Sequence, residues 1–240
     1  MKMLYFFYLF IFFISCKLKT EPISDNLIQP SAINASFQKI EVVTEGLEYI
    51  KASMILYDRN IISNDWEIKD SFAVVVGKNG LAYDYTQIIY KEQKLKIKHE
   101  GDGCSPTGYF TLGKVFSYHL LSNLKMPFEQ VDENDLCVDD VHSIYYNILI
   151  DDDTVITKDY SSFERMQRKD EQYEYGVWVN YNTDPQVKGN GSCIFLHIWK
   201  NENSGTSGCT AMSKENMLKL IEWLDKEKNP ILYQYTRNPN

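Results

Sequence analysis

The chain has 240 residues, of which 44% are hydrophobic and 14% aromatic, with 25 basic and 33 acidic side chains and a formal net charge of −8. This composition predicts one ordinary globular domain and excludes a disordered, collagen-like or repeat chain. The acidic balance, without a Lys/Arg cluster, argues against nucleic acid as the main partner. Seventeen Tyr and twelve Phe favour a β-rich core, because aromatic side chains suit a pleated, half-buried surface.

The N-terminus has the pattern of an export signal. Residues 4–14 form an unbroken apolar run, which is too short for a membrane span of about 20 residues but fits the core of a secretory signal. The run ends at Ser15-Cys16, which resembles a bacterial lipoprotein signal, where cleavage leaves the cysteine as a lipidated N-terminus. We therefore expect residues 1–15 to be a lipoprotein-type signal peptide and Cys16 to anchor the protein to a membrane, facing the periplasm or cell wall. The alternative is an ordinary cleaved signal; either way the protein is exported.

Residues 16–38 are expected to be the lipidated cysteine and a tether. The segment after Cys16 is polar, contains Pro22 and Pro30, and shows neither the helical nor the strand period of apolar residues. A flexible segment of this kind has a reach of roughly 25 Å on random-coil scaling. The remaining residues, 39–236, are expected to form the domain.

Within the domain, short β-type runs alternate with turns. The expected strands are 39–44, 52–57, 72–77, 109–112, 176–181, 193–198 and 231–235. Asn79-Gly80 follows the third run and favours a tight hairpin turn, because both residue types tolerate positive φ. The pattern predicts a mainly β domain of the α+β class.

Two helices are expected, over 159–168 and from 214 to about 227. The second has Ser213 as a plausible N-cap and Pro230 as a stop signal. Its apolar residues recur at helical spacing, at Met217, Leu220, Ile221 and Leu224. The sequence shows no internal repeat, so a single β-dominated domain with a late helix is the economical interpretation.

The residues best suited to chemistry lie between 191 and 212. A buried-type strand ends in His197, a polar loop follows, and Cys209 then stands between Gly208 and the start of the late helix. Neutral imidazole can accept the thiol proton, N–H groups near a helix start favour the thiolate, and glycine lets the backbone approach a substrate. Amides around Gly208 and Cys209 are candidates for an oxyanion hole.

Two other interpretations of these residues remain open on residue type alone. A lone cysteine is usually a small buried hydrophobe, and a lone histidine is more often a core residue than a base. A Cys₃His zinc set of Cys193, His197, Cys209 and Cys104 is disfavoured, because residues 193 and 197 of an extended strand lie about 13 Å apart. We expect neither a metal nor another cofactor.

Two motifs together resemble the L,D-transpeptidase (YkuD-type) catalytic domain. His197 and the box Thr206-Ser207-Gly208-Cys209 occupy the places of the family's histidine and its Ser/Thr-His-Gly-Cys nucleophile box. Residues 101–110, GDGCSPTGYF, resemble the family's Gly-Asp-Gly-x-Thr-Pro-x-Gly-x-Phe element. The motifs have the family's order, and the resemblance covers about residues 39–235. It implies a β-sandwich with a helix after the cysteine.

The resemblance implies an acyl transfer on peptidoglycan stem peptides. Cys209 would attack the carbonyl of the third stem residue, typically the L-centre of a diamino acid, while His197 manages the protons. An amine would then form a cross-link, or water would complete a carboxypeptidase or endopeptidase reaction, including release of a wall-linked protein. Thr206, Ser207 and Gly208 would hold the oxyanion and substrate. The group that orients the histidine is expected to be a side chain or a backbone carbonyl in the loop 201–205.

The chain departs from the family pattern at two positions. Ser207 replaces the histidine of the box, and Ala211 replaces the usual Arg or Asn two residues after the cysteine. Both lie where substrate is held, and the SGCTAM form looks closer to a divergent branch that includes hydrolytic members. A cell-wall-binding lipoprotein that has lost turnover is the alternative to an enzyme, although retention of Cys209 and His197 favours the enzyme.

Sequences of the branch that this chain resembles carry cysteine at the positions of both Cys137 and Cys193, so the resemblance implies a Cys137–Cys193 disulfide. Two buried free thiols are the alternative in an exported chain. Cys104 is expected to be a free thiol. Asp102 is expected to satisfy local backbone, and residues 151–153 to form a solvated loop. Three further side chains are expected either to line a stem-peptide groove or to belong to the core: Trp199, Tyr181 and Asn182.

Overall fold

Alternating burial along residues 38–59 produces two long antiparallel strands, β1 (Gln38–Thr44) and β2 (Lys51–Arg59), at the start of the domain. The computed structural model describes residues 35–85 and 95–238. The expected signal peptide, Cys16 and most of the tether therefore lie outside the described residues. Within the described ranges, no helix has the length and apolar character needed to cross a membrane.

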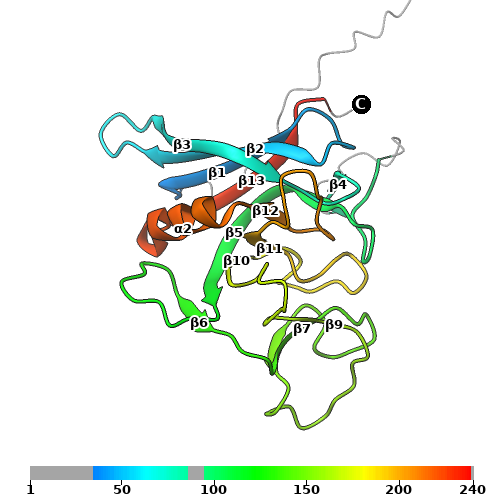
Figure 1. The fold of residues 1–240 in the computed structure, drawn as a ribbon. Helices are drawn as coiled ribbons and strands as arrows, with labels where there is room; N and C mark the ends of the chain where they lie inside the picture. Colours follow the sequence, from blue (N-terminus) through cyan, green and yellow to red (C-terminus); the bar gives the residue numbers. More distant parts are fainter. Residues whose placement is uncertain (1–34, 86–94, 239–240) are drawn as a thin grey trace, which may run out of the picture.

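The main sheet closes on itself. Its hydrogen-bonded order is β10-β11-β12-β3-β2-β1-β13-β5-β4, and β5 also pairs with β10, which completes a ring (Figure 1). Short β6 adds to β5. The further bounds are β3 (Trp66–Val75), β4 (Leu81–Tyr83), β5 (Ser105–Ser117), β6 (Phe128–Gln130), β10 (Tyr175–Val179), β11 (Phe195–Ile198), β12 (Thr210–Met212) and β13 (Ile231–Thr236).

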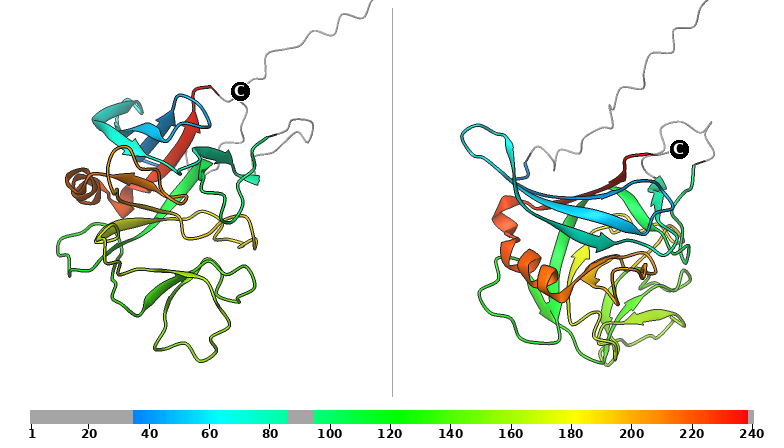
Figure 2. Two further views of the ribbon diagram at one scale, coloured as in Figure 1. Left: turned by 45° about the vertical axis from the view of Figure 1, so that its right-hand side comes forward. Right: turned by 45° about the horizontal axis from the view of Figure 1, so that its top comes forward.

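The core fills the space inside this ring, so the domain is built like a β-sandwich, as expected. Inward-facing residues from opposite sides of the ring meet there, for example Ile40, Val74 and Leu196, each at most 1% exposed. Helix α2 (Lys214–Trp223) packs against β10 and β11 (Figure 2). Its apolar residues Met217, Leu220 and Ile221 are buried in the core. Burial of apolar surface of this kind supplies the main favourable free energy of folding.

A second, smaller sheet lies beside β10 and β11, at the bottom of Figure 1. It has the order β8-β7-β9 among the described residues, with β7 (Asp135–Val138), β8 (Leu149–Asp151) and β9 (Phe163–Arg165). The Cys137–Cys193 disulfide joins β7 to the segment just before β11. We call residues 131–172 the flap; the disulfide fastens the flap to the main sheet.

The seven expected strands all form, with shifted ends, but the first expected helix does not. The segment 159–168 contains strand β9 rather than a helix, because pairing with β7 outweighs a weak helical pattern. The tight turn expected at Asn79-Gly80 forms, with the Gly80 N–H donating to the Gly77 carbonyl at 2.8 Å and an antiparallel bridge between Gly77 and Gly80. The next strand, β4, pairs in parallel with β5 and not with β3.

The late helix is confirmed, although it ends earlier than expected. Helix α2 stops at Trp223, and a short 3₁₀ helix, Lys226–Lys228, follows before β13. Ser213 is the N-cap, and its Oγ accepts the Asn216 N–H at 3.2 Å.

Removal of this cap is expected to weaken the domain. In Ser213→Ala the Asn216 N–H loses its acceptor, so we expect the free energy of unfolding to fall by about 1 kcal/mol. Urea denaturation followed by circular dichroism measures the change. Ser213→Asp, which retains a capping oxygen, is the matched control, and an equal loss in both variants would contradict the capping role.

Candidate active site

The register of β11 and β12 brings the two motif residues together. These strands are parallel neighbours, with His197 opposite Ala211, and Cys209 immediately precedes β12. The intervening loop is fixed to the end of β3: the Thr206 N–H donates to Val76 O at 3.0 Å, and the Lys78 N–H donates to Thr206 O at 2.7 Å. Both motif residues line one cavity of about 150 Å³.

The Cys209 thiol is buried, with 5% of the residue exposed. Its Sγ accepts the Phe195 N–H at 3.3 Å, and the thiol donates to the Cys193 carbonyl at 3.4 Å. Burial, followed by the negative charge of Glu164, raises the pKa of Cys209 to about 12. The resting residue is therefore a neutral thiol.

The expected activation by a helix start is wrong. Strand β12 separates Cys209 from α2, which begins at Lys214, so the free N–H groups of the helix are directed elsewhere. The backbone donor that faces the sulfur is instead the Phe195 N–H, which lowers the pKa of Cys209 against the effect of burial.

His197 is held as a neutral base. Its Nδ1 lies 2.8 Å from Ile198 O, and because a carbonyl only accepts, Nδ1 carries the proton and Nε2 is left as the acceptor. Tyr173 contacts the ring edge-to-face, with centroids 5.0 Å apart. Burial lowers the pKa of His197 to about 4. The orienting group is thus a backbone carbonyl, but it belongs to β11 and not to the loop 201–205.

This buried imidazole makes the fold sensitive to acid. As the pH falls below 6.5, His197 becomes protonated in the unfolded chain, whereas in the folded chain it stays neutral until about pH 4. The free energy of unfolding therefore falls as the pH falls through this window. The loss amounts to about 3 kcal/mol. Urea titrations at pH 7 and at pH 4 measure this change. Between the two pH values, the free energy of unfolding of His197→Gln is expected to fall less than that of the unsubstituted protein. An equal loss would contradict the burial of a neutral histidine.

The box residues hold the backbone of Cys209 in place. The Thr206 hydroxyl donates to Cys209 O at 2.6 Å, and the Gly208 N–H donates to Thr206 Oγ1 at 3.1 Å. Since the Gly208 amide is engaged in the resting state, the Cys209 amide is the better candidate of the two for an oxyanion. Gly205 is needed for close approach, because a Cβ there would lie 2.5 Å from Lys78 Cα.

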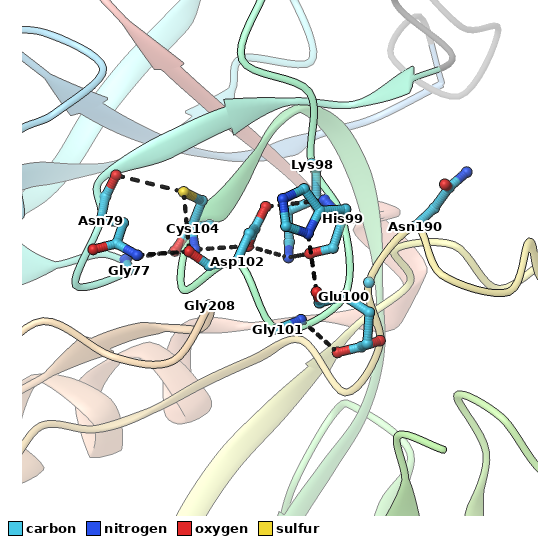
Figure 3. Close-up of polar contacts among 12 residues, drawn as sticks. Gly77, Asn79, Lys98, His99, Glu100, Gly101, Asp102, Cys104, Asn190 and Gly208 are labelled. Carbon is cyan, nitrogen blue, oxygen red and sulfur yellow. Dashed lines mark hydrogen bonds and ion pairs between the residues drawn. The ribbon is translucent and has the colours of Figure 1, made fainter. Parts of the chain in front are cut away.

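The Gly-Asp-Gly element supports the box from the other side (Figure 3). Ser105, which was not among the predicted site residues, donates to Cys209 O at 2.7 Å and accepts the Gly77 N–H at 2.8 Å. Asp102 accepts the His99 and Cys104 N–H groups at 2.9 and 2.8 Å, as expected for a residue that satisfies local backbone. The two motifs therefore form one connected structure.

A second cavity, of about 220 Å³, is also lined by Cys209. Both cavities share Lys78, Glu164, Ser207 and Cys209. The first is also lined by Arg168, Gln172, Tyr173, His197, Gly205 and Thr206. The second is also lined by Lys98, Glu100, Gly101, Gly103, Asp139, Ser192, Cys193 and Gly208.

The flap and the residue directly after it supply two site residues that sequence reasoning missed. Glu164 lies opposite Cys137 in the β7–β9 pairing, and the disulfide from Cys137 to Cys193 brings this strand pair to the thiol. The Tyr173 hydroxyl donates to Glu164 Oε2 at 2.7 Å, which links Glu164 to the residue packed on His197. Neither residue stands in a motif, so only the three-dimensional pairing reveals them.

The structure also tests the expectations for Cys137, Cys193 and Cys104. The Cys137–Cys193 disulfide is present, which also removes Cys193 from any zinc set. Cys104 is a buried free thiol, as expected, and its Sγ lies 3.4 Å from Asn79 O.

The three residues considered for a stem-peptide groove instead make contacts within the fold. Tyr181 is a core residue whose hydroxyl donates to Asn190 O at 2.6 Å, and the Asn182 side chain donates to Val187 O and Gly191 O. The Trp199 N–H continues the β11–β12 pairing by donating to Met212 O at 2.8 Å. None of the three lines either cavity beside Cys209.

Comparison with known families agrees with this geometry. The family model of the L,D-transpeptidase catalytic domain (YkuD) matches residues 52–232, a range that contains both motifs, the flap and α2. Neither the curated proteins nor the solved structures gave a match to the chain. The chain belongs to the L,D-transpeptidase (YkuD) catalytic domain family.

Proposed function

We propose that this protein is an exported, lipid-anchored acyl transferase in which Cys209 forms a thioester with a peptidoglycan stem peptide. The observation that carries the proposal is the shared cavity of Cys209 and His197, with Nε2 of the histidine left as a proton acceptor. Family membership supports peptidoglycan as the substrate. The anchor at Cys16 rests on the sequence pattern alone.

The reaction begins with a proton transfer. In the resting state the thiol donates to Cys193 O, so substrate entry must turn it toward His197, a rearrangement common in unliganded active sites. Nε2 of His197 then takes the Sγ proton while Sγ attacks the carbonyl carbon of the third stem residue. The oxyanion is stabilised by the Cys209 amide and the adjacent box.

Collapse of the intermediate completes the first half of the reaction. The bond between the carbonyl carbon and the leaving nitrogen breaks, His197 returns its proton to that nitrogen, and the thioester remains on Cys209. An amine of a second stem, or water, then attacks the thioester carbonyl while His197 takes the proton of the attacking group. The bond between the carbonyl carbon and Sγ breaks, and His197 returns the proton to Cys209. The first route gives a cross-link and the second gives carboxypeptidase or endopeptidase products.

Incubation with defined substrates tests this proposal. The chain without its first 18 residues is mixed with disaccharide-tetrapeptide and with protein-linked sacculi, and products are identified by mass spectrometry. Cross-linked dimers indicate transpeptidation, whereas tripeptides or released protein indicate hydrolysis. Absence of product together with absence of an acyl adduct on Cys209 would reduce the protein to a wall-binding lipoprotein.

A further inference from the structure

The antiparallel hairpin of β2 and β3 ends in an exposed apolar tip. Residues 61–64 of this tip carry no charge, and Ile61 and Ile62 are 87% and 97% exposed. Turns normally carry Gly, Asn, Asp, Pro or Ser, so two consecutive isoleucines are unusual there. The hairpin projects at the upper left of Figure 1, at the end of the molecule opposite the flap, and the views of Figure 2 agree. Two large apolar side chains are therefore presented at a protruding point.

The backbone of the tip is largely satisfied by the hairpin itself. The Asn60 side-chain oxygen accepts the N–H groups of Ile62 and Ser63 at 2.9 and 3.1 Å, and the Asn60 carbonyl accepts the Asn64 N–H at 2.9 Å. Three of the four tip N–H groups are thus paired without water. Backbone groups that enter an apolar medium need such internal partners, so this tip is suited to leave water.

Aromatic and cationic side chains lie directly behind the tip. Arg59 and Trp66 face each other across the two strands, with the guanidinium carbon 5.3 Å from the indole centre. The Lys39 ammonium lies 5.0 Å from the same ring and 4.4 Å from the ring of Tyr57. Trp, Tyr, Arg and Lys are the residues that occupy the headgroup level of a bilayer. The order from apolar tip to aromatic and cationic layer therefore matches the order from hydrocarbon to headgroups.

The charges beside the tip cancel. A groove of about 670 Å³ lies between the tip and Phe37. It is lined by three basic and three acidic residues, namely Arg59, Lys69, Lys228, Asp58, Glu67 and Glu227. Since Lys69 pairs with Glu67 at 3.1 Å and Lys228 with Asp58 at 3.3 Å, the groove favours neither an anionic nor a cationic partner. Zwitterionic headgroups fit this balance.

The chain enters the domain at the base of this hairpin. The Phe37 N–H donates to Lys228 O at 2.7 Å, and the Arg59 N–H donates to Phe37 O at 2.9 Å. The tether that leads to the expected anchor at Cys16 therefore begins beside the apolar tip. A second copy of the chain is a poorer partner, because stable interfaces bury about 1,200 Å² or more and a narrow tip offers far less.

We propose that the tip, residues 61–64, inserts into the zwitterionic lipid surface of the membrane that holds the anchor. Burial of Ile61 and Ile62 among the lipids supplies the favourable free energy, and Trp66 and Arg59 remain at the headgroups. This inference rests on the lipid anchor of the proposed function. The flap lies at the opposite end, so a docked hairpin would turn the flap away from the membrane.

Fluorescence quenching on vesicles tests the contact. Residues 17–240 with an N-terminal hexahistidine are held on phosphatidylcholine vesicles that contain a nickel-chelating lipid, which anchors the chain whether or not Cys16 is lipidated. Half of the preparations also contain phosphatidylcholine brominated near the headgroup, which quenches tryptophan on contact. We expect brominated lipid to lower the tryptophan emission, and we expect Trp66→Phe to abolish this decrease. The decrease should persist at high salt, because the contact is apolar.

Matched substitutions separate the tip from other exposed residues. Ile61→Ser/Ile62→Ser should abolish the quenching, whereas Ile156→Ser should not, because Ile156 is 98% exposed but lies in the flap. Absence of quenching in the unsubstituted protein, or equal quenching in the double variant, would overturn the proposal. A dimer in solution that only the double variant loses, without quenching, would assign the tip to a second copy and also overturn it.

The anchor is tested separately by the mass of the full-length protein recovered from membranes. A lipid adduct on Cys16 is expected. If that adduct is absent while the tip is still quenched on vesicles, the anchor of the proposed function fails and the tip contact stands. If the adduct is present without quenching, the tip contact fails and the anchor stands.

Discussion

Cys209→Ala is expected to reduce product formation by at least about 10³-fold, to the background of the uncatalysed reaction. Without Sγ no thioester forms, and the imidazole of His197 has no thiol to deprotonate. The substitution removes one buried atom next to Phe195 and Cys193, so the fold should persist. The measurement is the rate of product release, together with the mass of the protein after exposure to substrate.

The matched control is Cys104→Ala. Cys104 is also a buried free thiol and lies in the Gly-Asp-Gly element, yet it lines neither cavity beside Cys209. Its removal should leave the rate and the acyl adduct nearly unchanged. Products that persist in Cys209→Ala, or an adduct found on Cys104, would refute the assignment of the nucleophile.

The second large effect is expected from removal of the disulfide. Cys137 and Cys193 are 56 residues apart, and the entropy of closing such a loop in the unfolded chain corresponds to about 4 kcal/mol. The double variant Cys137→Ala/Cys193→Ala should lose about that much free energy of unfolding. It should also lose activity, because the flap that lines both cavities beside Cys209 is no longer fastened.

Urea denaturation measures the stability, and alkylation confirms the starting state. In the denatured, unreduced chain without its first 18 residues, only Cys104 and Cys209 should be alkylated, whereas reduction should expose all four thiols. Cys104→Ala again serves as the control, since it removes a buried thiol without opening a loop. A double variant as stable as this control would show that the disulfide does not hold the flap.

Local sequence signals predicted the parts of the fold that local structure determines. Residues 214–223 form a helix because Ser213 caps it and its apolar residues are buried in the core. The segment 159–168 was predicted incorrectly because its conformation depends on pairing with β7, which no local pattern reveals. The tight turn at Gly80 was predicted from its own residues, but the pairing of the following strand β4 with the distant β5 was not.

The candidate active site also has residues that local motifs predict and residues that only distant pairing brings in. His197, Cys209 and the box stand in contiguous motifs, so their residue types and spacing were enough to identify them. Glu164 reaches the thiol through the flap, and Tyr173 packs on the imidazole from the position directly after the flap; their sequence neighbours give no sign of either contact. The Phe195 N–H was also missed, because a backbone donor carries no signature in the residue that supplies it.

The position of Cys193 has a consequence for oxidative folding. Cys137, Cys193 and Cys209 pack in one cluster, and the Cys193 carbonyl contacts the Cys209 thiol. Four cysteines allow three complete pairings, and any mispairing of Cys193 with Cys209 would consume the proposed nucleophile while leaving the flap unfastened. Correct pairing therefore determines both whether the flap is fastened and whether Cys209 stays free. The fraction of molecules in which Cys137 is joined to Cys193 and Cys209 remains reduced is the fraction that keeps both a secured flap and a free nucleophile.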